Sequence, residues 1–120
     1  MFSIWHDTVT VYHKHYIKNT SGKDVPEWTR RTYTNCFVRV EWTSAQNDHV
    51  QNKTDNAIFR LPLRAIVDTG DVIVKGRSEY VPPIATSAMT IINNNKNAFM
   101  VKAVHMNDQI QPVHVYVEGV

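Results

Sequence analysis

Residues 27–42, which read EWTRRTYTNCFVRVEW, decide the fold. From Cys36 to Trp42 apolar and polar side chains alternate, and this period of two is typical of a half-buried β-strand. The half before it, from Trp28 to Thr34, is polar on both faces. We therefore expect one long strand with a bend or bulge near Asn35, which would carry the strand between two sheets or round the corner of a barrel.

Strand patterns recur along the rest of the chain. Their ranges are 7–16, 57–63, 71–76, 90–92, 98–106 and 112–118. Short strands separated by frequent turns favour an antiparallel arrangement over an α/β layout. The sequence predicts an all-β fold, a small antiparallel β-barrel or sandwich of six to eight short strands, with long loops and at most one short helix.

Three segments lack the strand pattern. Residues 1–6 form an apolar amino-terminal arm, residues 43–56 are the most polar stretch, and residues 77–97 contain two adjacent prolines and a cluster of asparagines. We expect 43–56 and 77–97 to be long surface loops, with a helical turn or two within residues 78–89. At 120 residues the chain is predicted to be a single domain.

The composition argues against several function classes. Thirteen Lys and Arg against eleven Asp and Glu give a net charge of +2, which is too even for a protein that grips nucleic acid. A single cysteine, Cys36, excludes an intrachain disulfide framework and a cysteine-based zinc cluster. No apolar run approaches a membrane span, and the first residues lack the features of a signal peptide. We expect a protein of cytoplasmic origin with no membrane partner.

The triplet Asp68-Thr69-Gly70 is the sharpest motif in the chain. The same triplet forms the active loop of retroviral-type aspartic proteases, in which two copies share one proton between two carboxylates. Such an enzyme also needs a glycine-rich flap and a glycine behind the active loop, whereas residues 77–118 contain no glycine. We interpret the triplet as a tight turn in which Gly70 takes a positive φ.

Two histidines form the next candidate site. His13 and His15 lie two residues apart on one strand face, and His6, His105 or His114 are candidates for a third metal ligand. A zinc or iron site usually adds a carboxylate or thiolate, and sequence spacing does not show that these residues converge. We predict no metal ligand, no cofactor and no catalytic residue, and leave the His13–His15 alternative open.

Other chemistry has weaker signals. Cys36 shares an apolar strand face and is expected to be a small buried hydrophobe. Arg30, Arg31 and Trp28 are compatible with an oligonucleotide-binding barrel, although solvated strand faces or subunit contacts are the simpler interpretation. Large apolar residues at the amino-terminal end need a cover, from the barrel itself or from a neighbour. The predicted subunit or partner contacts are Phe2, Ile4, Trp5, Arg30, Arg31 and Tyr80.

Three passages, taken in order, resemble a family of small proteins encoded in the structural-gene clusters of tailed bacteriophages and prophages. They are Asp7–Tyr12 (DTVTVY), Gly70–Gly76 (GDVIVKG) and His114–Gly119 (HVYVEG). Members of that family resemble head-completion or stopper proteins of the neck, which are small β-barrels that assemble as a ring between the portal or adaptor and the tail. Residues 77–97 depart from the pattern, and the family has no catalytic motif to transfer.

The resemblance implies a virion structural protein at the head–tail junction, made in the cytoplasm of the bacterial host. Its partners would be further copies of itself, in a hexameric or dodecameric ring, and the portal or adaptor and tail proteins. Packaged DNA would pass nearby without sequence-specific binding. A tail-terminator or another tail-end ring protein is the neighbouring alternative. A retropepsin-like protease and an oligonucleotide-binding barrel are the other two.

Overall fold

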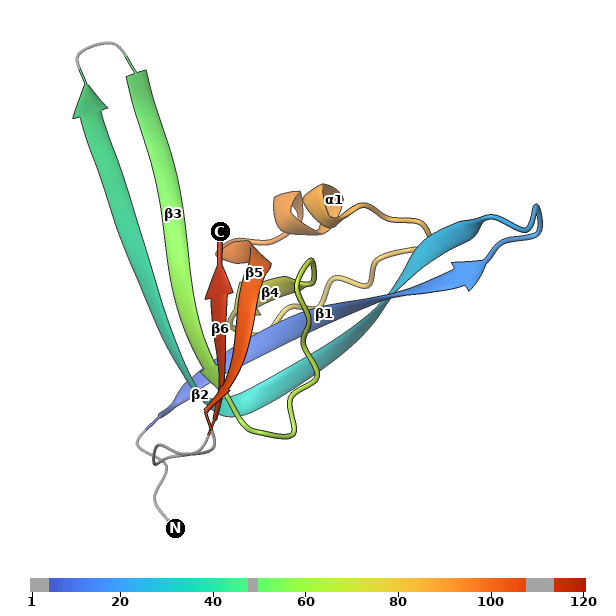
Figure 1. The fold of residues 1–120 in the computed structure, drawn as a ribbon, viewed down its shortest axis with the longest axis horizontal. Coiled ribbons are helices and arrows are strands. Elements are labelled where there is room, and N and C mark those ends of the chain that lie inside the picture. The colour runs from blue at the N-terminus through green and yellow to red at the C-terminus, as the bar shows by residue number, and fades with distance from the viewer. Residues whose placement is uncertain (1–4, 48–49, 108–113) are drawn as a thin grey trace.

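A computed structural model describes residues 5–47, 50–107 and 114–120, with 41–47 and 50–55 described by their backbone. The described strands close into one antiparallel barrel in the order β1-β2-β3-β6-β5-β4, and β4 pairs with β1 to complete it (Figure 1). The elements are β1 (Asp7–Lys18), β2 (Asp24–Asn47), β3 (Val50–Leu61), β4 (Val72–Lys75), α1 (Ala88–Asn93), β5 (Ala98–Asn107) and β6 (His114–Gly119). The predicted all-β fold with one short helix is confirmed, and it is a barrel.

The first corner of the barrel is the bulge expected in β2. Tyr33 pairs with Val9 and Cys36 pairs with Asp7, so β2 carries one extra residue between these two pairs. Asn35, within the bulge, has φ 57°, a left-handed conformation that asparagine tolerates better than most residues. Beyond the bulge β2 leaves β1 and pairs with β3. The prediction of one long strand that turns a corner near Asn35 is confirmed.

The second corner lies in β5. This strand pairs with β4 through residues 98–100 and with β6 from Val101 onward, with a shift in register between Val101 and Ala103. Gly119 of β6 packs against this corner, where a Cβ atom would stand 2.8 Å from the Cβ of Phe99. Only glycine allows the two backbones to approach so closely.

The interior of the barrel is the main apolar core. Every strand contributes to it, so no strand can leave the barrel without opening the core. Its buried members are Val9, Val11, Tyr33, Cys36, Ala57, Phe59, Leu61, Val67, Ile73, Phe99, Val101, Val115 and Val117.

A second apolar cluster lies on the outer side of the wall that β1, β2 and β4 form, and α1 covers it. Its buried members are Tyr12, Trp28, Val72, Val74 and Ile91. This extra layer explains why both faces of β4 and of the middle of β1 are buried. A sheet with both faces covered accepts a continuous apolar run such as Val72-Ile73-Val74.

The predicted surface loop at 43–56 is wrong. Residues 43–47 continue β2 and residues 50–56 continue β3, and they pair from Thr43 opposite Thr54 to Asn47 opposite Val50. Strand pairing uses backbone N–H and C=O groups, so a polar sequence does not prevent it. The polar composition of residues 43–56 indicates that they are exposed to solvent, but it does not indicate whether their backbone is a strand or a loop.

The predicted strand at 90–92 is also wrong, because these residues belong to α1. The side chain of Ser87 caps the helix by accepting a hydrogen bond from the Thr90 N–H. Ile91 is buried against the second apolar cluster and holds the helix to the barrel wall. The helical turn or two expected within residues 78–89 is misplaced, because residues 77–87 are irregular and the helix begins at Ala88.

The molecule is less compact than a typical domain of its length. Its radius of gyration is 15.8 Å, compared with about 14 Å expected for 120 residues. Figure 1 shows the reason, which is that strand pairs β1–β2 and β2–β3 reach well beyond the barrel. Among the described residues no helix has the length and apolar character needed to cross a membrane.

Candidate functional site

Two strand pairs extend from the barrel as two-stranded ribbons. The first ribbon consists of residues 13–18 and 24–29, and the second ribbon consists of residues 41–47 and 50–56. The third strand ends before each ribbon begins, since β4 reaches β1 at residues 9–12 and β6 reaches β3 from Ala57 onward. In the described chain, each ribbon strand therefore has one edge without a strand partner, which is a template for pairing with another chain.

A buried carboxylate replaces the missing strand at the base of the first ribbon. The Oδ1 atom of Asp71 accepts a hydrogen bond from the Lys14 N–H at 2.9 Å, and its Oδ2 atom accepts one from the Asp68 N–H at 2.8 Å. Oδ2 also lies 2.7 Å from Nδ1 of His13, a third donor when that nitrogen carries its proton. These partners offset the cost of burying the charge.

The same residues form a candidate metal cluster. One ligand atom each of His13, Asp68 and Asp71 lies within 4.8 Å of the others, and His13 Nδ1 is 3.8 Å from Asp68 Oδ2. Nitrogen and carboxylate ligands of this kind suit zinc or another transition metal. His15 does not join them, because its Nε2 atom lies 2.7 Å from Oε1 of Glu27. The hydrogen bonds to Asp71 already account for its burial, so we interpret the cluster as an anchor for the turn.

The turn itself is the Asp68-Thr69-Gly70 triplet. Gly70 has φ 91°, and the Asp71 N–H donates to the Asp68 carbonyl at 3.1 Å. The Gly70 N–H donates to the Val101 carbonyl at 2.9 Å and ties the turn to β5. The prediction of a tight turn with Gly70 at positive φ is confirmed. The Asp68 side chain is 76% exposed on this turn, and the covered cleft of an aspartic protease is not what surrounds it.

Cys36 is fully buried inside the barrel, as expected for a small hydrophobe. Burial raises the pKa of its thiol to about 12. The Sγ atom lies 3.5 Å from the carbonyl oxygen atoms of Tyr33 and Thr34. A thiol that stays protonated and covered is a poor nucleophile.

The residues proposed for oligonucleotide binding are used within the fold. Trp28 is buried in the second apolar cluster, and its indole N–H donates to the Thr86 carbonyl at 2.8 Å. Arg30 donates from Nη1 to the Ser78 carbonyl at 2.7 Å, and the same nitrogen lies 3.5 Å from Oε2 of Glu79. A stacking platform needs an exposed aromatic face, and Trp28 does not offer one. Arg31 is exposed on the neighbouring position of β2.

Residues 77–97 are held against the barrel by a buried polar network centred on Ser78. The Ser78 N–H donates to Thr10 Oγ1 at 2.9 Å, and the Ser78 hydroxyl contacts Tyr12 at 2.6 Å and donates to Asn95. The Tyr12 hydroxyl also lies 2.7 Å from the Tyr80 carbonyl. Burial raises the pKa of Tyr12. The network makes this segment a fixed part of the structure.

The predicted contact residues are spread over different parts of the molecule. Phe2 and Ile4 lie outside the described residues. Trp5 packs against Phe37 at 6.3 Å and against His114 at 5.3 Å between ring centroids. Arg30 and Arg31 lie on the part of β2 that pairs with β1, and Tyr80 packs half-buried against the second apolar cluster. Of the predicted contact residues that the structure describes, Trp5 therefore lies apart from Tyr80.

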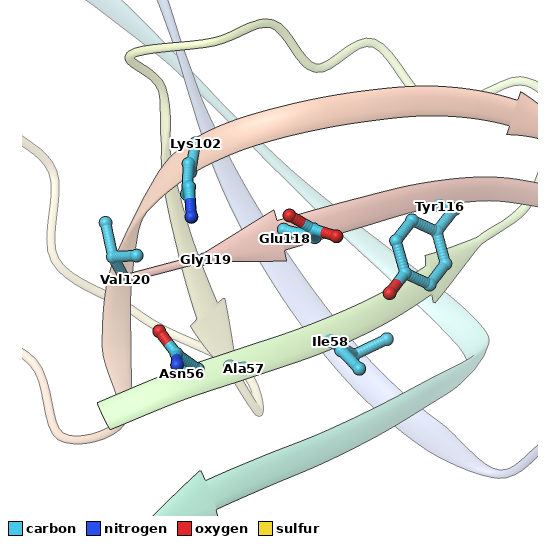
Figure 2. Close-up of a pocket in the computed structure, with 8 residues that line it drawn as sticks. All are labelled: Asn56, Ala57, Ile58, Lys102, Tyr116, Glu118, Gly119 and Val120. Atoms are coloured by element: carbon cyan, nitrogen blue, oxygen red, sulfur yellow. The ribbon is translucent and has the colours of Figure 1, made fainter. Parts of the chain in front are cut away.

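A shallow pocket lies on the outer face of the sheet that β3, β5 and β6 form (Figure 2). It has an empty volume of about 480 Å³ that is open to solvent. Figure 2 shows the side chains of Lys102, Glu118 and Tyr116 around it, with Ile58 on the neighbouring strand. Beside Ile58 on β3, the Arg60 guanidinium lies 5.0 Å from the centroid of the Phe37 ring, and its buried Nε atom has no hydrogen-bond partner among the described residues. The mixed charges and small depth give this pocket little power to select one ligand.

Sequence reasoning missed Asp71, Ser78 and Tyr12 as organising residues. Each sits in an unremarkable strand or loop pattern, and each meets partners more than fifty residues away. The available signal was the acidic residue after the Asp68-Thr69-Gly70 turn, which can cap a turn with its side chain. No local pattern marks a tyrosine or a serine for a buried network.

Comparisons with known proteins give one match. The sequence model of a family of unknown function, DUF6751, matches residues 4–120 of the chain. No curated protein and no solved structure gave a significant match.

Proposed function

The chain belongs to the DUF6751 family, whose function is unknown, and we propose that it is a structural subunit of the phage neck. In this proposal it is a head-completion or stopper-type protein that forms a ring, joins the portal or adaptor to the tail and helps retain packaged DNA. It resides in the virion at the head–tail junction after synthesis in the host cytoplasm. Its partners are copies of itself, the portal or adaptor, and tail proteins.

The observation that carries the proposal is the second ribbon. Its strands have seven residues each and pair with each other without a third strand in the described chain. At about 3.4 Å per residue, such a ribbon reaches roughly 20–24 Å. A two-stranded ribbon in water is marginally stable at best. A projecting ribbon with free edges therefore fits a subunit that is completed by its neighbours.

The composition of the second ribbon favours a polar contact surface. Residues 41–47 and 50–56 contain few apolar residues, so the ribbon has little to bury against its own barrel. Backbone hydrogen bonds along a free edge give affinity without an apolar face, as in strand addition between proteins. A ribbon that pairs with a different surface of the next copy makes a heterologous contact. Such contacts form a closed ring when the rotation from each copy to the next adds up to a full turn.

The three passages that resemble the neck family all lie in the barrel wall. Residues 7–12 lie in β1, residues 70–76 contain β4 with its two flanking turns, and residues 114–119 form β6. The resemblance thus concerns the barrel. The near-neutral net charge of +2 also supports the proposal, because it suits a surface that lies near DNA without binding it tightly. A tail-terminator ring protein is supported by the same features, and it is the second candidate.

The test compares the full chain with two matched variants. In the ribbon variant, residues 44–53 are replaced by Asn-Gly, which joins the paired residues Thr43 and Thr54 by a two-residue turn. In the control, residues 19–23 are replaced by Asn-Gly between the paired residues Lys18 and Asp24. Light scattering and negative-stain electron microscopy then measure ring formation, alone and with purified portal or adaptor protein of the same phage.

We expect rings or portal-bound complexes from the full chain and from the control variant. The ribbon variant should remain folded by circular dichroism but stay monomeric. A full chain that remains monomeric with and without the portal would contradict the proposal. Rings that form on tail tubes but not on the portal would favour the tail-terminator alternative.

A further inference from the structure

The side chains that anchor the turn before β4 converge on one small region. His13 lies on β1, whereas Asp68 and Asp71 lie at the two ends of the turn. One ligand atom of each residue lies within 4.8 Å of the other two. The Nδ1 atom of His13 is 2.7 Å from Asp71 Oδ2 and 3.8 Å from Asp68 Oδ2. We call these three residues the His–Asp cluster.

The distances in the His–Asp cluster are close to those between ligands of one metal ion. Zinc binds imidazole nitrogen and carboxylate oxygen at about 2.0–2.2 Å, so two of its tetrahedral ligands lie roughly 3.3–3.6 Å apart. To reach this spacing, His13 Nδ1 has to move about 0.6–0.9 Å away from Asp71 Oδ2 and about 0.2–0.5 Å closer to Asp68 Oδ2. The terminal torsions of histidine and aspartate are broad, so side-chain rotation supplies shifts of this size.

Asp71 is fixed in the orientation that a metal ligand needs. Its side chain is 2% exposed, Oδ1 accepts the Lys14 N–H, and Oδ2 accepts the Asp68 N–H. A carboxylate oxygen has two lone pairs, so Oδ2 keeps one lone pair, which faces Nδ1 of His13. A metal ion between these two atoms would replace the proton of their hydrogen bond, and the neutral imidazole would then carry its proton on Nε2. Carboxylate ligands of metals are held by further hydrogen bonds in this way.

Asp68 supplies a second, independent observation. Its side chain is 76% exposed and free to extend into solvent, yet its Oδ2 atom points towards His13 and the Asp71 carboxylate. Two carboxylates at this separation repel each other, and a divalent cation between them removes the repulsion. The ammonium of Lys14 lies near the turn, 3.6 Å from the position that a Cβ atom would take on Gly70, and it offsets part of the negative charge. The exposed side of Asp68 leaves room for a water molecule as a further ligand.

A second histidine on the same strand provides a comparison. The Nε2 atom of His15 lies 2.7 Å from Oε1 of Glu27, and both side chains are more than one-third exposed. Within the part of the chain that the structure describes, the His–Asp cluster is the only group of three such side chains with the spacing of metal ligands. His15 and Glu27 thus make a surface pair with the same chemistry but without the third ligand.

We propose that the His–Asp cluster binds one divalent transition-metal ion of the zinc type. The ligands are Nδ1 of His13 and one oxygen atom each of Asp68 and Asp71, and water completes the coordination shell. The ion ties β1 to the turn, directly beside the pairing of Tyr12 with Val72 that closes the barrel. This inference does not depend on the proposed function, because the site lies within a single chain.

Zinc titration of the full chain tests the site. The protein is purified without a histidine tag, treated with EDTA and titrated with ZnCl₂ by isothermal titration calorimetry, and the Tm is measured with and without zinc. We expect one zinc ion per chain and a higher Tm with zinc, because a ligand that binds the folded chain stabilises it. A chain that binds no zinc, or whose bound zinc does not involve the cluster in the variants below, would overturn the proposal.

Asp68→Asn separates metal binding from the anchoring of the turn. This side chain is exposed, so the Tm of the variant in EDTA should match that of the native chain. Its zinc affinity should fall at least about tenfold, and the rise in Tm with zinc should disappear. His13→Gln should lose zinc binding as well, and the Asp68 variant decides the question if His13→Gln does not fold. The matched control His15→Gln removes the contact with Glu27 and should keep the native zinc affinity.

Equal zinc affinities in the native chain and in Asp68→Asn would overturn the proposal, as would a larger loss in His15→Gln than in Asp68→Asn. Nitrogen-15 NMR of the imidazole rings adds a direct signal from the ligand atom. On addition of zinc, the Nδ1 resonance of His13 should shift while its Nε2 atom keeps a proton. A zinc-dependent shift of His15 with none at His13 would place the ion at the surface pair and overturn the assignment.

Discussion

The Nδ1 atom of His13 lies 2.7 Å from the Oδ2 atom of Asp71 and fastens the turn before β4 to the first strand of the barrel. The same carboxylate accepts the N–H groups of Lys14 and Asp68. Asp71 thus connects β1 to the turn at residues 68–71, two segments that are far apart in the sequence.

Replacement of this carboxylate should destabilise the fold. In Asp71→Asn one oxygen becomes an NH₂ group, which cannot accept the N–H bond that its position demands, at a cost of about 2–3 kcal/mol. The matched variant Asp68→Asn changes an exposed side chain and should alter the free energy of unfolding by less than about 0.5 kcal/mol. Urea denaturation measures both. Equal losses in the free energy of unfolding of the two variants would show that the Asp71 carboxylate does not connect these segments.

The corner of β2 should tolerate glycine better than a β-branched residue. Asn35 has φ 57° and an exposed side chain, so substitutions there test the backbone rather than the packing. We expect Asn35→Gly to leave the free energy of unfolding nearly unchanged and Asn35→Val to lower it by about 1–2 kcal/mol. Thermal and urea unfolding give the comparison. A neutral valine would mean that the corner relaxes to an ordinary extended conformation.

The hydroxyl of Tyr12 should matter more than that of any exposed tyrosine. Tyr12→Phe removes the group that lies between Ser78 and the Tyr80 carbonyl, and we expect a loss of about 1–3 kcal/mol. Residues 77–97 should also become more open to trypsin, which can cut there at Arg77 and Lys96. Tyr16→Phe, at an exposed position, serves as the control. Unchanged cleavage rates would contradict the role of the network.

Stability should fall at alkaline pH because of Cys36. Its pKa rises from 9.0 to about 12 on burial, so the folded protein keeps a proton that the unfolded chain loses between these values. The contribution is complete below pH 9 and is lost as the pH rises towards 12, with a slope of at most about 1.4 kcal/mol per pH unit. Urea unfolding between pH 8 and 10.5 measures this slope. Cys36→Ala should be less stable overall but show a flatter profile, and an unchanged slope would assign the effect to other groups.

Several features of the fold follow from local sequence. The alternation in residues 36–42 predicts a half-buried strand, and the break in that pattern before Asn35 predicts the corner. Gly70 after two polar residues predicts the turn. The corner and the turn are confirmed, and the half-buried strand is confirmed over residues 36–40, where burial is described. These features depend on the period of the side chains and on the φ angles that asparagine and glycine allow, which are properties of short stretches.

The two wrong predictions concern segments whose conformation is set by the structure they adjoin rather than by their own composition. Residues 43–56 are polar enough for a loop, yet they extend β2 and β3 because pairing that starts in the barrel continues along the backbone. Residues 90–92 have β-branched side chains, yet they are helical because Ile91 fills a space over Val72 and Val74. In α1 packing overrides local propensity, and in residues 43–56 backbone pairing overrides a polar composition.

The sequence by itself determined most of the strands, the corner at Asn35 and the turn at Gly70, because each of these is set by side-chain period or backbone sterics within a few residues. Only the tertiary structure decided that Asp71 meets His13, that Ser78 meets Tyr12, and that the Trp28 indole meets the Thr86 carbonyl. Those relationships join segments that chain closure brings together, and no local pattern specifies which strand lies across from which.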